Sequence, residues 1–136
     1  MIKTKMIESR LNSDERGSLV AIEGEKNLGY RIARVFYMFG MNGNAVRGKH
    51  ANRDSTMCFI ALKGKCRIIV DDGIQRDTFI LDAPAKGLIC YPMTWKEIDD
   101  FSSDCILMCI CDTCYNAAEY INNYELFINE VRGAKN

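Results

Sequence analysis

The sequence predicts a single all-β domain, a sandwich or small barrel of short strands. Three observations lead to this fold class. The apolar segments are short, turn signals separate them at roughly eight- to twelve-residue spacing, and there is no low-complexity tract or obvious repeat. A chain of 136 residues, 48% of them apolar, is long enough to bury one core. We therefore expect one domain over residues 1–136.

The predicted strands begin with SLVAIEG (18–24) and RIARVFYMFG (31–40), two apolar runs typical of strands. STMCFIALKG (55–64) and KCRIIVDDG (65–73) follow. Lys63-Gly64-Lys65 joins them, which predicts a tight hairpin.

Asp72-Gly73 marks a further turn, into a strand over IQRDTFILD (74–82). GLICYP (87–92) and CILMCICD (105–112) continue the series. The last of these is apolar on both strand faces, with Cys105, Leu107, Cys109 and Cys111 on one face and Ile106, Met108 and Ile110 on the other. We expect this strand to be covered on both sides.

The end of the chain has a different period. In YNAAEYINNYELFINEVRG (115–133) the residues Tyr120, Tyr124, Phe127 and Val131 fall at helical spacing. Asn122-Asn123 can divide this segment, so the pattern predicts short C-terminal helices packed on the outside of the β-structure.

Seven cysteines are present: Cys58, Cys66, Cys90, Cys105, Cys109, Cys111 and Cys114. Their odd number predicts free thiols in a reducing compartment, where a cysteine packs as a small apolar residue. Zinc is the alternative, because Cys111 and Cys114 form one C-x-x-C unit, but no second unit appears. The N-terminal MIKTKMIESRL is too polar for a signal peptide, which favours the cytoplasm.

Charge and hydropathy exclude two classes of partner. Eighteen basic and eighteen acidic residues give no net charge, which argues against nucleic acid. No apolar run of about 18 residues indicates a membrane span.

RGKHAN (47–52) contains the only histidine, His50, which is either a metal ligand, an acid–base group or a surface residue. The chain around it resembles the two-part cupin signature, G-x5-H-x-H-x(3,4)-E-x6-G and then G-x5-P-x-G-x2-H-x3-N. Gly64, Gly87 and Pro92 match the frame. The four ligand positions of metal-binding cupins are occupied by His50, Asn52, Met57 and Glu97. A thioether and an amide are poor partners for imidazole and carboxylate, so the resemblance implies a cupin-type jelly-roll barrel without metal or other cofactor.

A closer resemblance covers the chain from Asp14 to Phe127. DERGSLVAIEG, RVFY, RGKHAN, LKGKCRIIVDDG, LDAPAKGLICYPMTWKEIDDFSSD and AAEYINNYELF occur in this order. Together they are similar to the nucleotide-sugar 3,4-ketoisomerases, and R-G-x-H-A followed by P-x-x-W-x-E-x-x-D-F-S is the specific part. The chain departs from the family pattern R-G-x-H-A-H by having Asn52 at the second histidine.

The resemblance implies a metal-free enzyme, usually a homodimer, that acts on dTDP-4-keto-6-deoxyglucose. It moves the ketone from C4 to C3, and the product feeds an aminotransferase that makes 3-amino-3,6-dideoxy sugars for surface glycans such as lipopolysaccharide. Such a shift needs a base that removes the C3 proton and returns a proton at C4. His50 has the suitable pKa range. The sequence leaves the configuration at C4 open.

Further candidate residues follow from the motifs. Tyr37 can relay a proton if its strand face lines the barrel, or it is a core tyrosine. Arg47 can bind the enediolate oxygen or the pyrophosphate. Arg34 lies on the face opposite Tyr37 and then contacts substrate only across a dimer interface. Asn52 can hydrogen-bond a sugar hydroxyl.

Two candidates come from the second motif. Trp95 stacks on the thymine or the sugar, or it is a barrel-wall aromatic. Glu97 points into the barrel and orients His50 or acts as a second acid–base, or it is a surface carboxylate. Two other functions stay open: a cupin-type epimerase on a 4-keto nucleotide sugar, and a sugar-nucleotide-binding module without activity.

Overall fold

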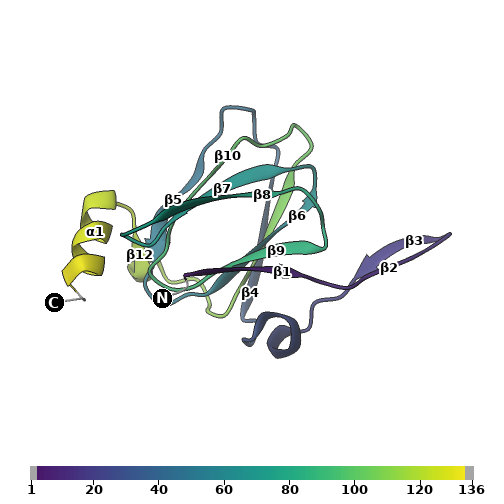
Figure 1. Cartoon of the computed structure of the whole chain (residues 1–136), viewed down its shortest axis with the longest axis horizontal. Helices are drawn as coiled ribbons and strands as arrows, with labels where there is room; N and C mark the ends of the chain where they lie inside the picture. The colour runs from purple at the N-terminus through teal and green to yellow at the C-terminus, as the bar shows by residue number, and fades with distance from the viewer. Residues whose placement is uncertain (1–2, 134–136) are drawn as a thin grey trace.

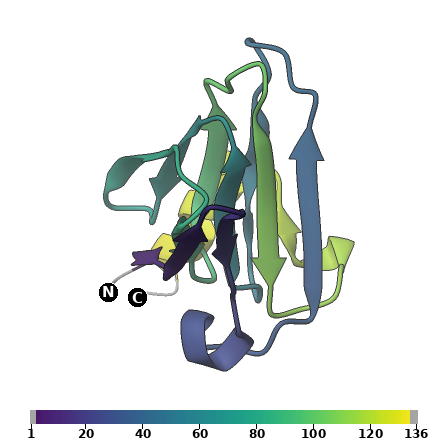
Figure 2. The ribbon, with the colours of Figure 1, turned by 90° about the vertical axis from the view of Figure 1, so that its right-hand side faces the viewer.

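Two five-stranded antiparallel sheets face each other in the computed structural model, which describes residues 3–133 (Figures 1 and 2). The first sheet has the order β1 (Thr4–Glu8), β9 (Lys86–Cys90), β6 (Met57–Lys63), β11 (Ile106–Cys111) and β4 (Arg34–Phe39). The second has the order β12 (Tyr120–Ile121), β5 (Arg47–Asn52), β10 (Trp95–Asp99), β7 (Cys66–Asp71) and β8 (Arg76–Leu81). The predicted all-β class is confirmed, with the two layers forming the flattened barrel of a jelly roll.

The main core fills the space between the two sheets. Alternate residues of β11, namely Leu107, Cys109 and Cys111, belong to it, together with Ile68 of β7 and Leu88 of β9. The prediction that the cysteines are free and pack as apolar residues is confirmed for all but one: Cys114 is exposed, and the other thiols are buried.

Two smaller clusters cover the outer faces of the sheets. Ile60, Ile89 and Ile110 of the first sheet pack against Leu28 of the short π-helix η1 (Gly24–Leu28). On the second sheet, the helix α1 (Tyr124–Gly133) supplies Phe127 and Val131, which meet Ala51, Trp95 and Ile121. No helix of the described residues is long and apolar enough to cross a membrane.

One two-stranded hairpin projects from this body. It consists of β2 (Leu11–Asp14) and β3 (Gly17–Val20), and it lies at the end of the molecule opposite α1 (Figure 1). The predicted strand 18–24 is therefore shorter than expected, because η1 begins at Gly24.

The predicted hairpin between residues 55–64 and 65–73 is wrong. Both strands exist, but β6 belongs to the first sheet and β7 to the second, so the turn at Gly64 crosses between the layers. Gly64 has a φ of 69°, which a glycine adopts readily. Lys63-Gly64-Lys65 therefore predicted the turn correctly, but not that the next strand belongs to the other sheet. The turn at Asp72-Gly73 does form a hairpin, between β7 and β8.

The predicted helix over 115–133 is correct only in its second half. Asn116 caps a 3-10 turn, η2 (Ala117–Glu119), and β12 then pairs with Ala51 and Asn52 of β5. The helix α1 starts after Asn123, whose side chain accepts a hydrogen bond from the Leu126 amide at 2.9 Å. Local periodicity missed this because the pairing partner of β12 lies some 70 residues away.

Candidate active site

A β-bulge in β5 directs the residues of the R-G-x-H motif. His50 pairs with Lys96 and Arg47 with Ile98, and the register shifts between Lys96 and Glu97. Gly48 and Lys49 have φ values of 83° and 57°. A Cβ on Gly48 would lie 2.9 Å from the Lys96 carbonyl oxygen. Because the bulge adds one residue, Arg47 and His50, three positions apart, occupy the same face of the sheet.

His50 lies on the inner face of β5 and is half-buried. Its Nδ1 is 3.0 Å from the Gly48 carbonyl oxygen, which can only accept, so Nδ1 carries the proton and Nε2 keeps its lone pair. Its ring meets the Tyr120 ring edge-on at 4.9 Å. Burial, and then the nearby Lys96, lower the pKa of His50 to about 4. At neutral pH, His50 is therefore an unprotonated base.

Asn52, Lys96 and Glu119 form a buried hydrogen-bonded chain beside His50. Asn52 Nδ2 donates to Glu119 Oε1 at 2.5 Å, and Lys96 Nζ donates to Asn52 Oδ1 at 3.3 Å. Lys96 also donates to the Thr94 carbonyl at 3.1 Å, and Ser55 Oγ lies 2.8 Å from Glu119 Oε2. The amide of Asn52 thus links a carboxylate to an ammonium group.

Arg34 lies on the inner face of β4, at the opposite wall. Its Nη2 is 3.6 Å from Cys111 Sγ, and its guanidinium carbon lies 5.4 Å from the centre of the Phe36 ring. The hydrogen bond with Cys109, together with Arg34, lowers the pKa of Cys111 to about 7. The Nε of Arg34 is buried and has no hydrogen-bond partner among the described residues. A buried N–H without an acceptor favours binding of an oxygen from another molecule.

The expectation that Tyr37 lines the barrel is wrong. Tyr37 is 62% exposed, on the outer face of β4 with Val35 and Phe39, and it stacks on the Phe39 ring. The inner face of β4 consists of Arg34, Phe36 and Met38. Alternation was predicted correctly, but the face was reversed, because both faces of this strand are apolar in sequence.

Trp95 and Glu97 lie on the outer face of β10, not in the barrel. Trp95 packs against Phe127 of α1 and donates from Nε1 to Glu97 Oε2 at 3.0 Å. Glu97 is 3.8 Å from Arg76. The expectation that Glu97 points into the barrel is therefore wrong, because Lys96, one position away, takes the inner face.

The four cupin ligand positions are not brought together. Met57 is buried in the main core, and Glu97 lies across the sheet from His50 and Asn52. Within residues 3–133, no three His, Cys, Asp or Glu side chains are grouped as a metal ion requires.

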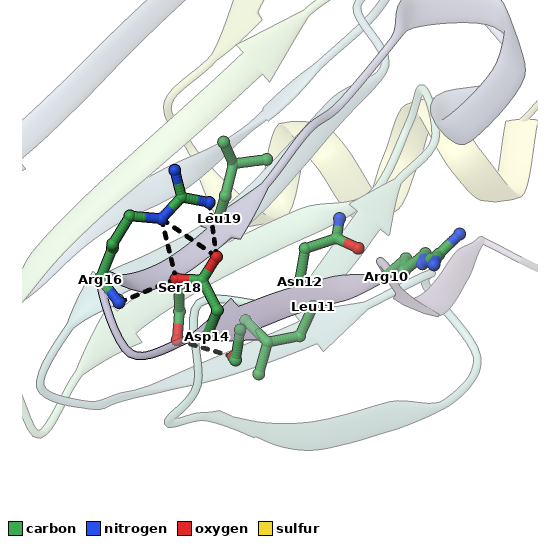
Figure 3. Close-up of a pocket in the computed structure, with 9 residues that line it drawn as sticks. Arg10, Leu11, Asn12, Asp14, Arg16, Ser18 and Leu19 are labelled. Atoms are coloured by element: carbon green, nitrogen blue, oxygen red, sulfur yellow. Dashed lines mark hydrogen bonds and ion pairs between the residues drawn. The ribbon is translucent and has the colours of Figure 1, made fainter.

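A hollow on the projecting hairpin is separate from this site. Figure 3 shows it along β2 and β3, between Arg10 and Leu19, with Arg16 held 2.6 Å from Asp14. It lies at the other end of the molecule from β5, β12 and α1 (Figure 1). Leu11 and Leu19 are exposed on the hairpin.

Sequence reasoning missed Lys96, Glu119 and Tyr120. Lys96 stands between Trp95 and Glu97, the two residues that match the P-x-x-W-x-E motif. Because neighbouring strand residues point to opposite faces, an outward-facing Trp95 places Lys96 on the inner face. Glu119 and Tyr120 were included in the predicted helix, where no strand pairing to β5 was expected.

Two facing antiparallel sheets, with one histidine and the basic side chains of Arg34, Arg47 and Lys96 on their inner faces, define a cupin-like protein. The model of the family described as WxcM-like, C-terminal (FdtA) matches residues 2–132, and the chain belongs to that family. A relative from Aneurinibacillus thermoaerophilus, a TDP-4-oxo-6-deoxy-alpha-D-glucose-3,4-oxoisomerase, is 41% identical over 126 residues, 93% of this chain and 91% of that protein.

Two solved structures show the same fold. The sugar 3,4-ketoisomerase QdtA from Thermoanaerobacterium thermosaccharolyticum, in complex with TDP, is 27% identical with a TM-score of 0.94, covering 97% of this chain and 96% of that one. The TDP-quinovose 3,4-ketoisomerase WlaRB from Campylobacter jejuni is 34% identical with a TM-score of 0.91, covering 95% and 99%. The relatives named here are thus all sugar 3,4-ketoisomerases.

Proposed function

We propose that the chain is a sugar 3,4-ketoisomerase that converts dTDP-4-keto-6-deoxyglucose to its 3-keto isomer by proton transfer. The family supports this activity. The single observation that carries the mechanism is the tautomer of His50: with Nδ1–H bound to the Gly48 carbonyl, Nε2 is a base on the inner face of the barrel. The residues beside it supply no set of metal ligands.

The reaction begins when Nε2 of His50 takes the proton from C3. The electrons of the C–H bond form a C3–C4 double bond, and the C4 carbonyl oxygen becomes an enediolate oxygen. The C3 hydroxyl proton passes to that oxygen, the C3 oxygen forms the new carbonyl, and the imidazolium returns its proton to C4. One imidazole serves both carbons because they are adjacent.

Arg34 and Arg47 divide the anionic groups between them. Arg34 is inside the barrel with a buried Nε lacking a partner among the described residues, and it binds the enediolate oxygen. Arg47 is exposed at the start of β5 on the face of His50, and it binds the diphosphate at the rim. TDP in the solved QdtA complex supports a nucleotide diphosphate ligand for this fold.

A homodimer is part of the proposal. The outer face of β4 is apolar and exposed, with Val35, Tyr37 and Phe39, and the hairpin β2–β3 exposes Leu19. An isolated two-stranded hairpin is marginally stable in water. We expect a second copy to cover these surfaces. Phe39→Asp should then shift the species measured by light scattering from dimer to monomer, whereas Ile74→Asp, exposed on a remote turn, should not.

The setting follows from the product. A 3-keto sugar nucleotide is the substrate that an aminotransferase needs to make a 3-amino-3,6-dideoxy sugar for surface glycans such as lipopolysaccharide. Free thiols at all seven cysteines fit a reducing compartment, the cytoplasm.

The test is incubation with dTDP-4-keto-6-deoxyglucose in deuterated water, followed by NMR. A ketoisomerase moves the carbonyl signal from C4 to C3. C4 then carries the proton returned by His50, or deuterium where the imidazolium exchanges with the solvent first, and the H4 coupling constants of the protium-bearing product give the configuration. An epimerase inverts C3 or C5 and leaves the ketone at C4, and a binding module changes nothing; either result would reject the proposal.

A further inference from the structure

Lys96 is a buried charged residue that the proton transfer by His50 does not itself require. It lies directly across the strand pair from His50, on the same inner face, and it is 2% exposed. A buried ammonium group without partners is costly, so its retention at this place needs a reason.

The surroundings are built to hold an ammonium ion. Asn52 presents its carbonyl oxygen to Lys96 and its amide N–H group to Glu119, so the amide dipole joins the two charges. The Thr94 carbonyl accepts a second N–H of Lys96. An ammonium group has three donors, and these two contacts satisfy two of them and fix its position.

We propose that Lys96 places a fixed positive charge beside His50, that Asn52 and Glu119 hold it there, and that this charge stabilises the enediolate. This inference rests on the proposed ketoisomerase function. Lys96 is a positioning residue in this scheme: it acts through the electrostatic potential at His50 and at the reacting carbons, where a preorganised charge favours the anion that forms.

The charge also sets the protonation state of His50. Burial lowers the pKa of His50 first, Lys96 lowers it further, and the Gly48 carbonyl and Glu119 oppose both effects. The ring of Tyr120 lies edge-on to the His50 ring, 4.9 Å away, and Arg47 lies on the same face of β5. An imidazolium formed beside a second cation is a stronger acid than an ordinary imidazolium, which favours return of the proton to C4 once His50 has taken it from C3.

Lys96 has its own surroundings on the inner faces of both sheets. The groups around it are Glu119, Cys90 of β9, and Cys109 and Cys111 of β11. Burial lowers the pKa of Lys96, and the carboxylate and the thiols oppose that shift. Asn52 stays uncharged at every pH, so of the two hydrogen-bonded side chains beside His50 only Lys96 can carry a positive charge.

The test uses the fact that His50 is the only histidine in the chain. A carbon–proton NMR titration of its imidazole Cε1 gives one unambiguous signal in the full-length protein, without any substrate. In the wild type, His50 should titrate well below 6. In Lys96→Met its midpoint should rise toward the ordinary value, and in Lys96→Arg it should stay low. Lys26→Met, an exposed lysine on η1, is the matched control and should leave the midpoint unchanged.

A second readout is the rate. With the nucleotide-sugar substrate, Lys96→Met should lower kcat by roughly 10²-fold with KM within about threefold, and Lys96→Arg should recover part of kcat. A wild-type midpoint near 6.5 would overturn the inference whether or not the variants fold. An unchanged midpoint in folded Lys96→Met would overturn it as well. A shifted midpoint in a protein that does not isomerise the sugar would instead reject the proposed function and retain the charge coupling.

Discussion

The two faces of the β5–β10 strand pair differ completely in chemistry although their residues alternate in one short stretch of sequence. The inner face has His50 and, beside it, Asn52 and Lys96, which are hydrogen-bonded to each other. The outer face has Ala51 and Trp95, which pack against α1. In the proposed mechanism the inner face carries out proton transfer, whereas the outer face attaches the C-terminal helix.

This difference shows that the residues of one sequence motif need not form one site. P-x-x-W-x-E predicts a set of functional residues, yet Trp95 and Glu97 are hydrogen-bonded to each other on the outer face, and Lys96 between them lies on the inner face. Substitutions on the two faces should consequently separate loss of activity from loss of stability.

The largest effect is expected for His50→Asn. Removing a positioned acid–base group lowers kcat by about 10²–10⁴-fold, while the affinity for TDP, measured by calorimetry, should stay within a few-fold. If the variant keeps most of its activity, the base is another group and the inner face is not the reaction centre.

On the outer face, Trp95→Ala should remove about 3–5 kcal/mol from the free energy of unfolding, because Trp95 is buried between the sheet and Phe127. Urea titration measures the loss. The KM for the sugar nucleotide should stay within about threefold under conditions where the variant is folded. A large rise in KM with little loss of stability would show that Trp95 contacts the substrate after all.

The pH dependence of the free energy of unfolding should report on the inner face, through His50. The folded pKa of His50, about 4, lies below the ordinary value, about 6.5. The unfolded chain binds the proton first, so the stability contributed by neutral His50 is complete above pH 6.5 and is lost as the pH falls through 4. The slope in this window is at most about 1.4 kcal/mol per pH unit. His50→Asn, titrated with urea in parallel, should lack this component, and kcat/KM of the wild type should persist to pH 5.

Asn52 should matter less than His50. Asn52→Ala removes the amide between Lys96 and Glu119, and we expect a loss of at most about tenfold in kcat. Asn52→His restores the family pattern and should bring no large gain. A hundredfold increase in kcat for Asn52→His would mean that the single-base route lacks a proton donor, and steady-state kinetics decides this directly.

The smallest effect is expected for Tyr37→Phe, on the exposed side of β4. Its hydroxyl lies on the outer face, away from His50, so kcat should change by less than about twofold. A drop of a hundredfold would return Tyr37 to the reaction, through contact with a second copy.

The sequence was sufficient for the strands that have a clear apolar pattern, and for selecting His50, which lies on the inner face of β5. It was insufficient wherever the outcome depended on distant pairing. Both faces of β4 are apolar in sequence, so only packing against β11 decides that Arg34 lies inside. The direction of Arg47 depends on a bulge against Lys96, and β12 depends on its pairing with β5. These are long-range effects that periodicity does not contain.

Because one thiol is exposed and six are buried, the native cysteines can be used to follow the unfolding of the protein. Cys114 is exposed and should react at once with an alkylating reagent, whereas six other thiols lie in β6, β7, β9 and β11 or next to them. Burial raises the pKa of Cys58 and Cys66 to about 12, so in the native state they are neither accessible nor ionised. Pulsed alkylation with mass spectrometry would then record, sheet by sheet, the order in which the two layers open, without any introduced label.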